Sequence, residues 1–236
     1  MCCHAGLVDA EFAHLDDADV AALYAMPRQR LPDGRAPIEL CMVASLDGSI
    51  SLDGLSGGLS SSADRLVLST LRTHSRCVLV AAGTVRSEGY GTPSRPDLTV
   101  AVVTNSCRLN WDGPLFTSGQ AIVITHEAAD LPSNIRAIRA GQTSVDIRLA
   151  ADQLQKFVPQ GGFIQLEGGP MLNATLHEHD LIDVVNLTLS PQLVGGTGRR
   201  MIESSVELTR KFNMQHAVSD GDCLFTRWTR RSEVAS

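Results

Sequence analysis

The chain has 236 residues, of which 43% are hydrophobic and 19% charged, and its formal net charge is −6. This composition is typical of a globular protein, and the acidic balance argues against a nucleic-acid partner, because such proteins usually carry a basic face. No apolar run approaches the roughly 20 residues needed to span a bilayer, so we expect no insertion into a membrane.

The N-terminus, Met1-Cys2-Cys3-His4, has neither the basic n-region nor the apolar h-region of a signal peptide. We therefore expect a cytoplasmic protein. The six cysteines include no C-x-x-C pair, which favours reduced thiols. Adjacent residues such as Cys2, Cys3 and His4 rarely close a tetrahedral metal site, so we expect no bound metal.

Residues 1–36 are polar and mixed, with a helical start near Asp16 and a Pro/Arg-rich exit, and they predict a leading helix and a linker to a domain at 37–236. Strands are predicted at 38–45, 77–82, 99–104, 121–125, 144–148, 162–166 and 183–190, and helices near 62–74, 133–140, 150–157 and 170–179. This alternation predicts an α/β fold with a mostly parallel sheet flanked by helices. Residues 221–228 alternate like a strand and follow 183–190 with no strong intervening helix, which predicts an antiparallel C-terminal edge.

Two polar motifs follow the first strand. In Ser45-Leu46-Asp47-Gly48, the Asp47 carboxylate at a strand end is suited to proton chemistry, although Asp-Gly is also a common turn dipeptide. In the helix that follows, Arg65, Ser69 and Arg72 share a face away from the apolar stripe. That face could bind a phosphate monoester or could simply be solvated.

The segment Leu166-Glu167-Gly168-Gly169-Pro170-Met171-Leu172 follows an apolar run, and two glycines make a turn before Pro170 at a first helical position. Backbone N–H groups at a helix N-terminus form an anion site suited to a phosphate or pyrophosphate. The alternative is an ordinary strand-to-helix loop that needs positive φ.

Together these segments resemble the pyrimidine reductase family of riboflavin biosynthesis, which is similar to the reductase half of bacterial bifunctional deaminase-reductases. The resemblance covers about residues 38 to 229 and rests on Ser45–Gly48, Leu71-Arg72, Val80–Arg86, Glu167–Pro170 and Ile182-Asp183 through Ser190-Pro191. It implies a dihydrofolate-reductase-like α/β fold. It also implies a homodimer and a deamination step carried out by another protein.

The resemblance implies NADPH as the cofactor. Its pyrophosphate would lie on Gly168, Gly169, Pro170, Met171 and Leu172, with further contacts from Gly83, Thr84, Glu88, Ser106, Arg108 and Ala44. The implied substrate contacts are Ser56, Arg72, Thr92, Arg95 and Glu167, with Arg72 and Arg95 on the ribose 5-phosphate. Gly57-Gly58-Leu59 stands where the bifunctional enzymes tend to have a tryptophan, so that aromatic contact is not expected.

The expected reaction is NADPH-dependent reduction of 5-amino-6-(5-phosphoribosylamino)uracil, or of its undeaminated analogue, to the ribitylamino form. Asp47 is the candidate for proton delivery, directly or through water, and Glu167 would orient the substrate. Two alternatives remain open. One is a dihydrofolate- or dihydropterin-type reductase on the same scaffold, and the other is a nucleotide-binding module without catalysis.

Overall fold

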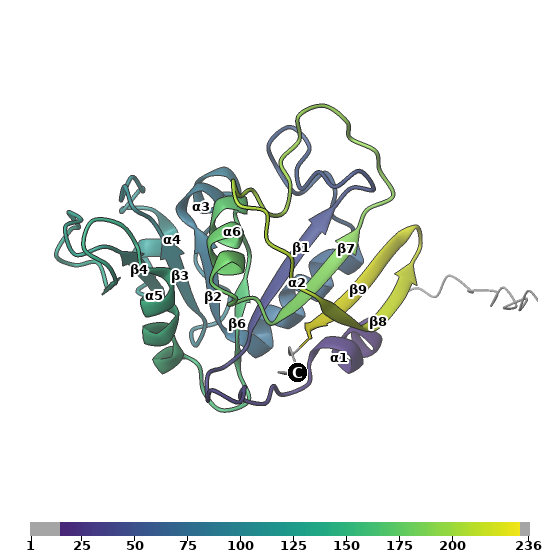
Figure 1. Cartoon of the computed structure of the whole chain (residues 1–236), viewed down its shortest axis with the longest axis horizontal. Helices are drawn as coiled ribbons and strands as arrows, with labels where there is room; N and C mark the ends of the chain where they lie inside the picture. Colours follow the sequence, from purple (N-terminus) through teal and green to yellow (C-terminus); the bar gives the residue numbers. More distant parts are fainter. Residues whose placement is uncertain (1–14, 232–236) are drawn as a thin grey trace, which may run out of the picture.

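The computed structural model describes residues 15–231, and within them nine strands form one sheet in the order β5-β4-β3-β2-β6-β1-β7-β9-β8 (Figure 1). The strands from β1 to β7 are parallel to their neighbours, whereas β9 pairs antiparallel with both β7 and β8. The predicted parallel sheet with an antiparallel C-terminal edge is confirmed. The strands are β1 (Ile38–Ala44), β2 (Arg76–Ala81), β3 (Thr99–Val103), β4 (Ala121–Thr125), β5 (Ala137–Arg139), β6 (Phe163–Leu166), β7 (Val184–Leu189), β8 (Phe212–Asp220) and β9 (Cys223–Arg230).

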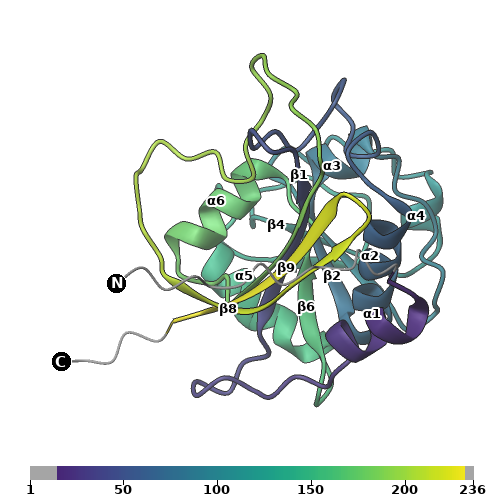
Figure 2. The same ribbon diagram turned by 90° about the vertical axis from the view of Figure 1, so that its right-hand side faces the viewer.

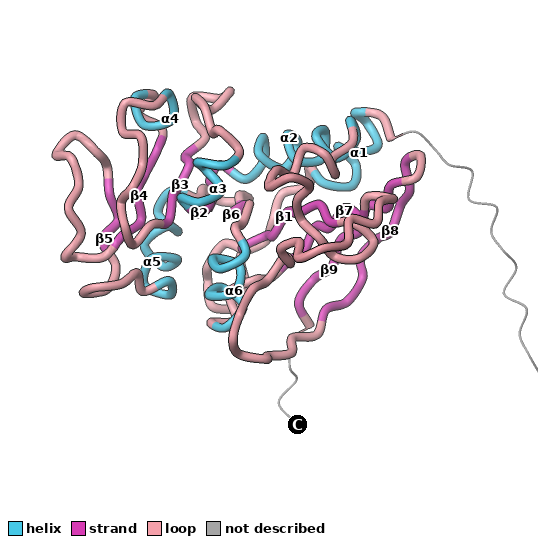
Figure 3. Tube along the Cα trace, turned by 90° about the horizontal axis from the view of Figure 1, so that it is seen from above, coloured by secondary structure: helices cyan, strands magenta, loops and turns pink. Residues whose placement is uncertain are grey.

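Helices cover both faces of the sheet, as the turned views show (Figures 2 and 3). Helices α1 and α2 lie on one face and α5 and α6 on the other, and each pair closes its own apolar core. The helices are α1 (Asp17–Tyr24), α2 (Ser62–Ser75), α3 (Ala82–Ser87), α4 (Pro114–Thr117), α5 (Ile147–Leu154) and α6 (Pro170–Glu178). No helix within residues 15–231 is both long and apolar enough to cross a membrane.

Local sequence signals explain the two helices on the first face. The Asp16 side chain accepts hydrogen bonds from the N–H groups of Ala18 and Asp19, and Asp19 completes a capping box. Ser61 caps α2 by accepting from the N–H of Asp64 at 3.1 Å. The predicted apolar stripe of α2 is buried at Ala63, Val67 and Leu71.

The segment around β5 corrects two predictions. Residues 133–140 were predicted as a helix, but 137–139 form strand β5 at the sheet edge. The predicted strand at 144–148 is also wrong, because Asp146 accepts from the N–H of Leu149 and starts α5 at Ile147. Buried residues at helical spacing, Ile147, Ala150, Ala151 and Leu154, then fix this segment against the core. Strand β8 was not predicted, since its residues are half-exposed or exposed and form no apolar run.

A buried carboxylate lies in an interior strand of the sheet, next to the middle strand β6. Glu39 of β1 is 0% exposed and accepts from Arg227 at 2.8 and 2.9 Å and from Arg28 at 2.5 and 3.3 Å. Burial alone would raise the pKa of Glu39, but the hydrogen bonds and charges of Arg227 and Arg28 hold it below its ordinary value. This cluster joins the linker after α1, strand β1 and the C-terminal strand.

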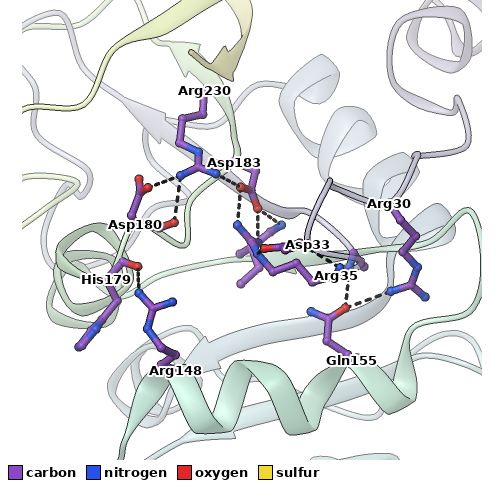
Figure 4. A network of polar contacts seen from close by, with 11 residues as sticks. Arg30, Asp33, Arg35, Arg148, Gln155, His179, Asp180, Asp183 and Arg230 are labelled. Atoms are coloured by element: carbon purple, nitrogen blue, oxygen red, sulfur yellow. Dashed lines mark hydrogen bonds and ion pairs between the residues drawn. The ribbon is translucent and has the colours of Figure 1, made fainter. Parts of the chain in front are cut away.

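A second ionic network holds the linker to the amino ends of β1 and β7 (Figure 4). Asp183 accepts from Arg35 Nη1 and Nη2 at 2.6 and 2.8 Å and from the N–H of Ile38 at 2.9 Å. Arg230 reaches the same carboxylate at 3.2 Å and also pairs with Asp180. The linker is therefore a fixed part of the fold.

Removing Arg227 from the buried Glu39 cluster should be costly, because it leaves acceptor positions of the buried Glu39 carboxylate and of Asn186 without a donor. We expect Arg227→Met to lower the free energy of unfolding by about 1–3 kcal/mol. Urea denaturation of both proteins measures the difference. The control, Arg231→Met at an exposed position after the same strand, should change it by less than about 0.5 kcal/mol. Equal effects of the two substitutions would contradict the role of the cluster.

Candidate functional site

The turns after β2 and β6 meet at the carboxyl edge of the sheet. Ala81 donates its N–H to the Gly168 carbonyl at 2.7 Å, and Glu167 donates its N–H to the Leu79 carbonyl at 3.0 Å. A Cβ on Gly169 would lie only 3.0 Å from Thr84 Oγ1. The approach of the second turn therefore leaves little room for a side chain at this position. Two motifs separated by more than eighty residues in the sequence thus form one surface.

Helix α6 starts at this turn. Gly169 is its N-cap, Pro170 its first residue, and no side chain caps it. The free N–H groups of the first turn and the helix dipole make this end suited to an anion. An anion site at this turn stays a prediction. Leu172 is buried in the core and Met171 is 68% exposed, so only their backbone groups belong to this end of the helix.

A cavity of about 580 Å³ opens beside the two turns. All the predicted site residues fall within the described range, and the structure brings eight of them to the cavity wall: Ser56, Arg72, Thr84, Glu88, Thr92, Glu167, Gly169 and Pro170. The others do not line it: Ala44, Asp47, Gly83, Arg95, Ser106, Arg108, Gly168, Met171 and Leu172.

The most strongly connected polar group of the cavity is Glu167, at the end of β6. Its carboxylate receives Arg72 in a bidentate pair, Nε to Oε1 at 2.7 Å and Nη2 to Oε2 at 2.5 Å. Gln165 donates to Oε1 at 2.9 Å, and the Tyr90 hydroxyl donates to Oε2. Burial alone would lower the pKa of Arg72, but the hydrogen bond to Glu167 and the charge of that carboxylate raise the pKa of Arg72 above its ordinary value.

Tyr90 is a cavity residue that the sequence analysis missed. The Arg72 guanidinium lies 5.4 Å from the centre of its ring, in cation–π range. Burial and the neighbouring Glu167 charge raise the pKa of Tyr90 well above its usual value, so the hydroxyl keeps its proton. The signal that could have found it is an aromatic residue isolated among glycines, in Glu88-Gly89-Tyr90-Gly91, in a chain with two tyrosines.

Asp47 fixes the two long loops at one end of the sheet, which Figures 1 and 2 show together. Its carboxylate accepts from Ser45 Oγ at 2.5 Å and from the N–H groups of Val194 and Gly195 at 3.1 and 2.6 Å. These hydrogen bonds lower the pKa of Asp47 to about 2. The side chain is therefore ionised at neutral pH and holds no proton of its own to deliver. Its contacts are those of a turn residue, and a part in proton transfer stays a prediction.

Several other predicted residues have protein partners. Arg95 pairs with Asp97 at 2.8 Å and donates to the Thr73 carbonyl at 2.9 Å. Glu88 Oε1 accepts from the N–H of Ser56 at 2.9 Å and so ties the loop before α2 to the end of α3. Ser106 and Arg108 are exposed in the loop after β3, where Arg86 donates to the Arg108 carbonyl at 3.0 Å.

The part of the chain that the structure describes contains no group of three or more His, Cys, Asp or Glu side chains placed to hold a metal ion. Cys2, Cys3 and His4, considered above as ligands, lie outside the described residues.

Comparison with solved structures shows which known proteins share this fold. A pyrimidine reductase-like protein from Corynebacterium diphtheriae superposes with a TM-score of 0.73 and 19% identity, over 84% of this chain and 93% of that one. RibD from Acinetobacter baumannii matches with a TM-score of 0.69 and 16% identity, over 84% of this chain and 59% of that one. Riboflavin biosynthesis reductase Rib7 from Saccharomyces cerevisiae matches with a TM-score of 0.65 and 15% identity, over 92% and 100%.

At these identities the superpositions show the fold alone, and the fold is the one that the resemblance implied. No curated protein matches the sequence. The family assignment comes from the sequence model described as the RibD C-terminal domain, which matches residues 37–224. This match covers strands β1 to β8, the start of β9 and every residue of the cavity wall, and the chain therefore belongs to the RibD C-terminal domain family.

Proposed function

We propose that the protein is an NADPH-dependent reductase that converts 5-amino-6-(5-phosphoribosylamino)uracil, or its undeaminated analogue, to the ribitylamino form. The observation that carries this proposal is the single cavity that joins an uncapped helix N-terminus to the Arg72–Glu167 pair, in a member of the RibD C-terminal domain family. The neighbour Rib7 is described as a riboflavin biosynthesis reductase, which supports the same reading.

NADPH oxidation, followed by absorbance with each of the two pyrimidine phosphates, tests the function directly. Turnover of at least one compound is expected. If the folded protein does not oxidise NADPH in the presence of either pyrimidine phosphate, the proposal is overturned.

The residues at the carboxyl edge fit a dinucleotide phosphate. Gly169 leaves the space that a Cβ would fill, and the backbone of Gly168 to Leu172 would hold the pyrophosphate with Gly83 and Thr84 beside it. Ser106 and Arg108 would lie toward the adenosine and its 2′-phosphate, Glu88 beside the cofactor and Ala44 near the nicotinamide. When bound, NADPH supplies the hydride that the sugar carbon of the ring-opened imine accepts. The protein contributes orientation and charge complementarity.

We assign the substrate phosphate first to Arg65. The resemblance pointed to Arg72 and Arg95, but Glu167 and Asp97 pair with those guanidinium groups. Of the arginines on the cavity wall, Arg199 pairs with Glu203. Arg65 is exposed, one heptad before Arg72 on α2, and within residues 15–231 it forms no ion pair with a carboxylate. Arg65 therefore has its full charge available for a phosphate monoester.

The resemblance also implies a homodimer, and we propose one through the β8–β9 hairpin. Met214 and Leu224 of this hairpin are 57% and 38% exposed, although apolar side chains of this size are usually buried. Residues 37–236 are proposed as one reductase domain that follows the helix and linker of 1–36. A cytoplasmic location stays a prediction.

The first prediction concerns the cofactor turn. Gly169→Asp places a side chain and a negative charge where the pyrophosphate would bind, so the dissociation constant for NADPH should rise at least about tenfold, or roughly 1.4 kcal/mol. Gly169→Ala adds only the Cβ that meets Thr84 and should cost less. Fluorescence titration with NADPH measures both variants. An unchanged dissociation constant in folded Gly169→Asp would remove the turn from the cofactor site.

The second prediction separates the phosphate from the rest of the substrate. A charge-assisted hydrogen bond contributes about 1.5–3 kcal/mol, so Arg65→Ala should lower kcat/KM for the phosphorylated pyrimidine by about tenfold or more. The dephosphorylated compound should barely be affected. Arg95 lies outside the cavity wall, so Arg95→Ala is the matched control. It should change the ratio of kcat/KM for the phosphorylated and dephosphorylated compounds less than Arg65→Ala does. Equal losses of Arg65→Ala on both compounds would favour a reductase of unphosphorylated pterins.

The third prediction uses the pKa of Asp47, which folding lowers from 3.8 to about 2. A lowered pKa means that the ionised side chain stabilises the fold fully above pH 3.8 and that this contribution is lost as the pH falls through about 2. Asp47→Asn should therefore have a lower Tm than the wild type near neutral pH, and the difference should shrink over that interval. Asp130→Asn, in the exposed loop after β4, is the control and should leave the Tm near neutral pH unchanged. A Tm difference that is constant with pH would contradict the assignment.

A further inference from the structure

The Glu167 carboxylate has no hydrogen-bonding capacity left for a ligand. A carboxylate offers about four acceptor positions, two on each oxygen. Arg72 Nε and Gln165 Nε2 occupy Oε1, and Arg72 Nη2 and the Tyr90 hydroxyl occupy Oε2. The side chain is only 5% exposed, so the remaining access to these oxygens is small.

Tyr90 supplies the donor that fills the last of these positions. Its ring packs against the apolar cluster that contains Val78, Val80 and Leu98, and this packing fixes the hydroxyl in place. Glu167 is paired with Arg72 and is therefore an acceptor, so the Tyr90 hydroxyl is the donor of their hydrogen bond.

The cluster consequently presents donors to the cavity. The Arg72 side chain is 37% exposed and lines the cavity wall. A guanidinium has five N–H donors and no acceptor, and Arg72 directs only two of them to Glu167. A ligand oxygen next to Arg72 can accept one of the remaining N–H groups and is stabilised. A ligand amino group at the same place finds no acceptor and stays without a hydrogen bond.

We propose that Tyr90 is a specificity-determining residue: by filling the last acceptor position of Glu167, it makes the Arg72–Glu167 pair select a ligand that places an acceptor oxygen there. This inference rests on the proposed function, whose two candidate pyrimidines differ by a ring carbonyl in one and an amino group in the other. The acceptor oxygen can come from that carbonyl or from the phosphate.

Tyr90→Phe tests the proposal, because it keeps the packed ring and opens one acceptor position on Glu167. Tyr24→Phe is the matched control, since it also removes a buried hydroxyl, but one that contacts His216 at 3.1 Å, away from the cavity wall. For each variant, kcat/KM is measured with the deaminated and undeaminated pyrimidine phosphates and with the dephosphorylated deaminated compound. Tm measurements confirm that each variant is folded.

If the carbonyl faces Arg72, the wild type prefers the deaminated compound, and Tyr90→Phe reduces that preference by about tenfold, because an amino group can then donate to Glu167. If the phosphate faces Arg72, Tyr90→Phe reduces instead the preference for the phosphorylated compound. Tyr24→Phe should leave both ratios unchanged. The proposal is overturned if Tyr90→Phe changes neither ratio, or if both tyrosine variants change them equally.

Dissociation constants for the same three compounds, measured by calorimetry, separate this proposal from the proposed function. If the wild type does not oxidise NADPH with any of the three compounds, the proposed function is wrong. The specificity proposal is then tested by comparing the ratios of dissociation constants in the wild type with those in Tyr90→Phe. If the wild type binds none of them, the specificity proposal fails too.

Discussion

The close approach of the turns after β2 and β6 is the constraint on which the site depends. The two strands are parallel neighbours, with Leu79 opposite Leu166, so their carboxyl ends lie at the same edge. The contact between the two turns leaves little room for a side chain at position 169, where a Cβ would lie 3.0 Å from Thr84 Oγ1, and α6 starts at this glycine. It also places Glu167 between the sheet and α2, within reach of Arg72. The position of the α6 N-terminus and the Arg72–Glu167 pair thus both follow from the approach of these two turns.

Charges around the cavity are mostly balanced within the protein. Glu167 pairs with Arg72, Arg199 pairs with Glu203, and Glu88 accepts from a backbone N–H. Pairing of this kind holds side chains in one geometry before a ligand arrives, which reduces the ordering cost of binding. Among the three arginines of the cavity wall, Arg65 alone forms no ion pair with a carboxylate of the described residues, and this is why we propose it for the anionic group.

Local patterns in the sequence predicted a large part of this arrangement. The apolar stripe of α2 and the glycine turn before Pro170 depend on a few neighbouring residues and were found where expected. The region of 133–148 was misread, because short apolar runs do not distinguish a strand from a helix without the Asp146 cap. The sequence could not predict which charged side chains pair with one another. Arg72 and Glu167 are 95 residues apart, and only the three-dimensional fold shows that the Arg72 guanidinium is paired with a carboxylate.

The buried Glu39 cluster has a consequence for how the chain folds as it is synthesised. Arg28 precedes Glu39 by 11 residues, whereas Arg227 follows it by 188. While the C-terminal strand is still in the ribosome, β1 can pair with β6 and β7 on both sides, but the Glu39 carboxylate still lacks the two hydrogen bonds from Arg227. Strand β1 reaches its final environment only when almost the whole polypeptide has emerged. Completion of the sheet is thus coupled to completion of translation, and a message truncated before β9 would yield a chain with an exposed strand edge at β7.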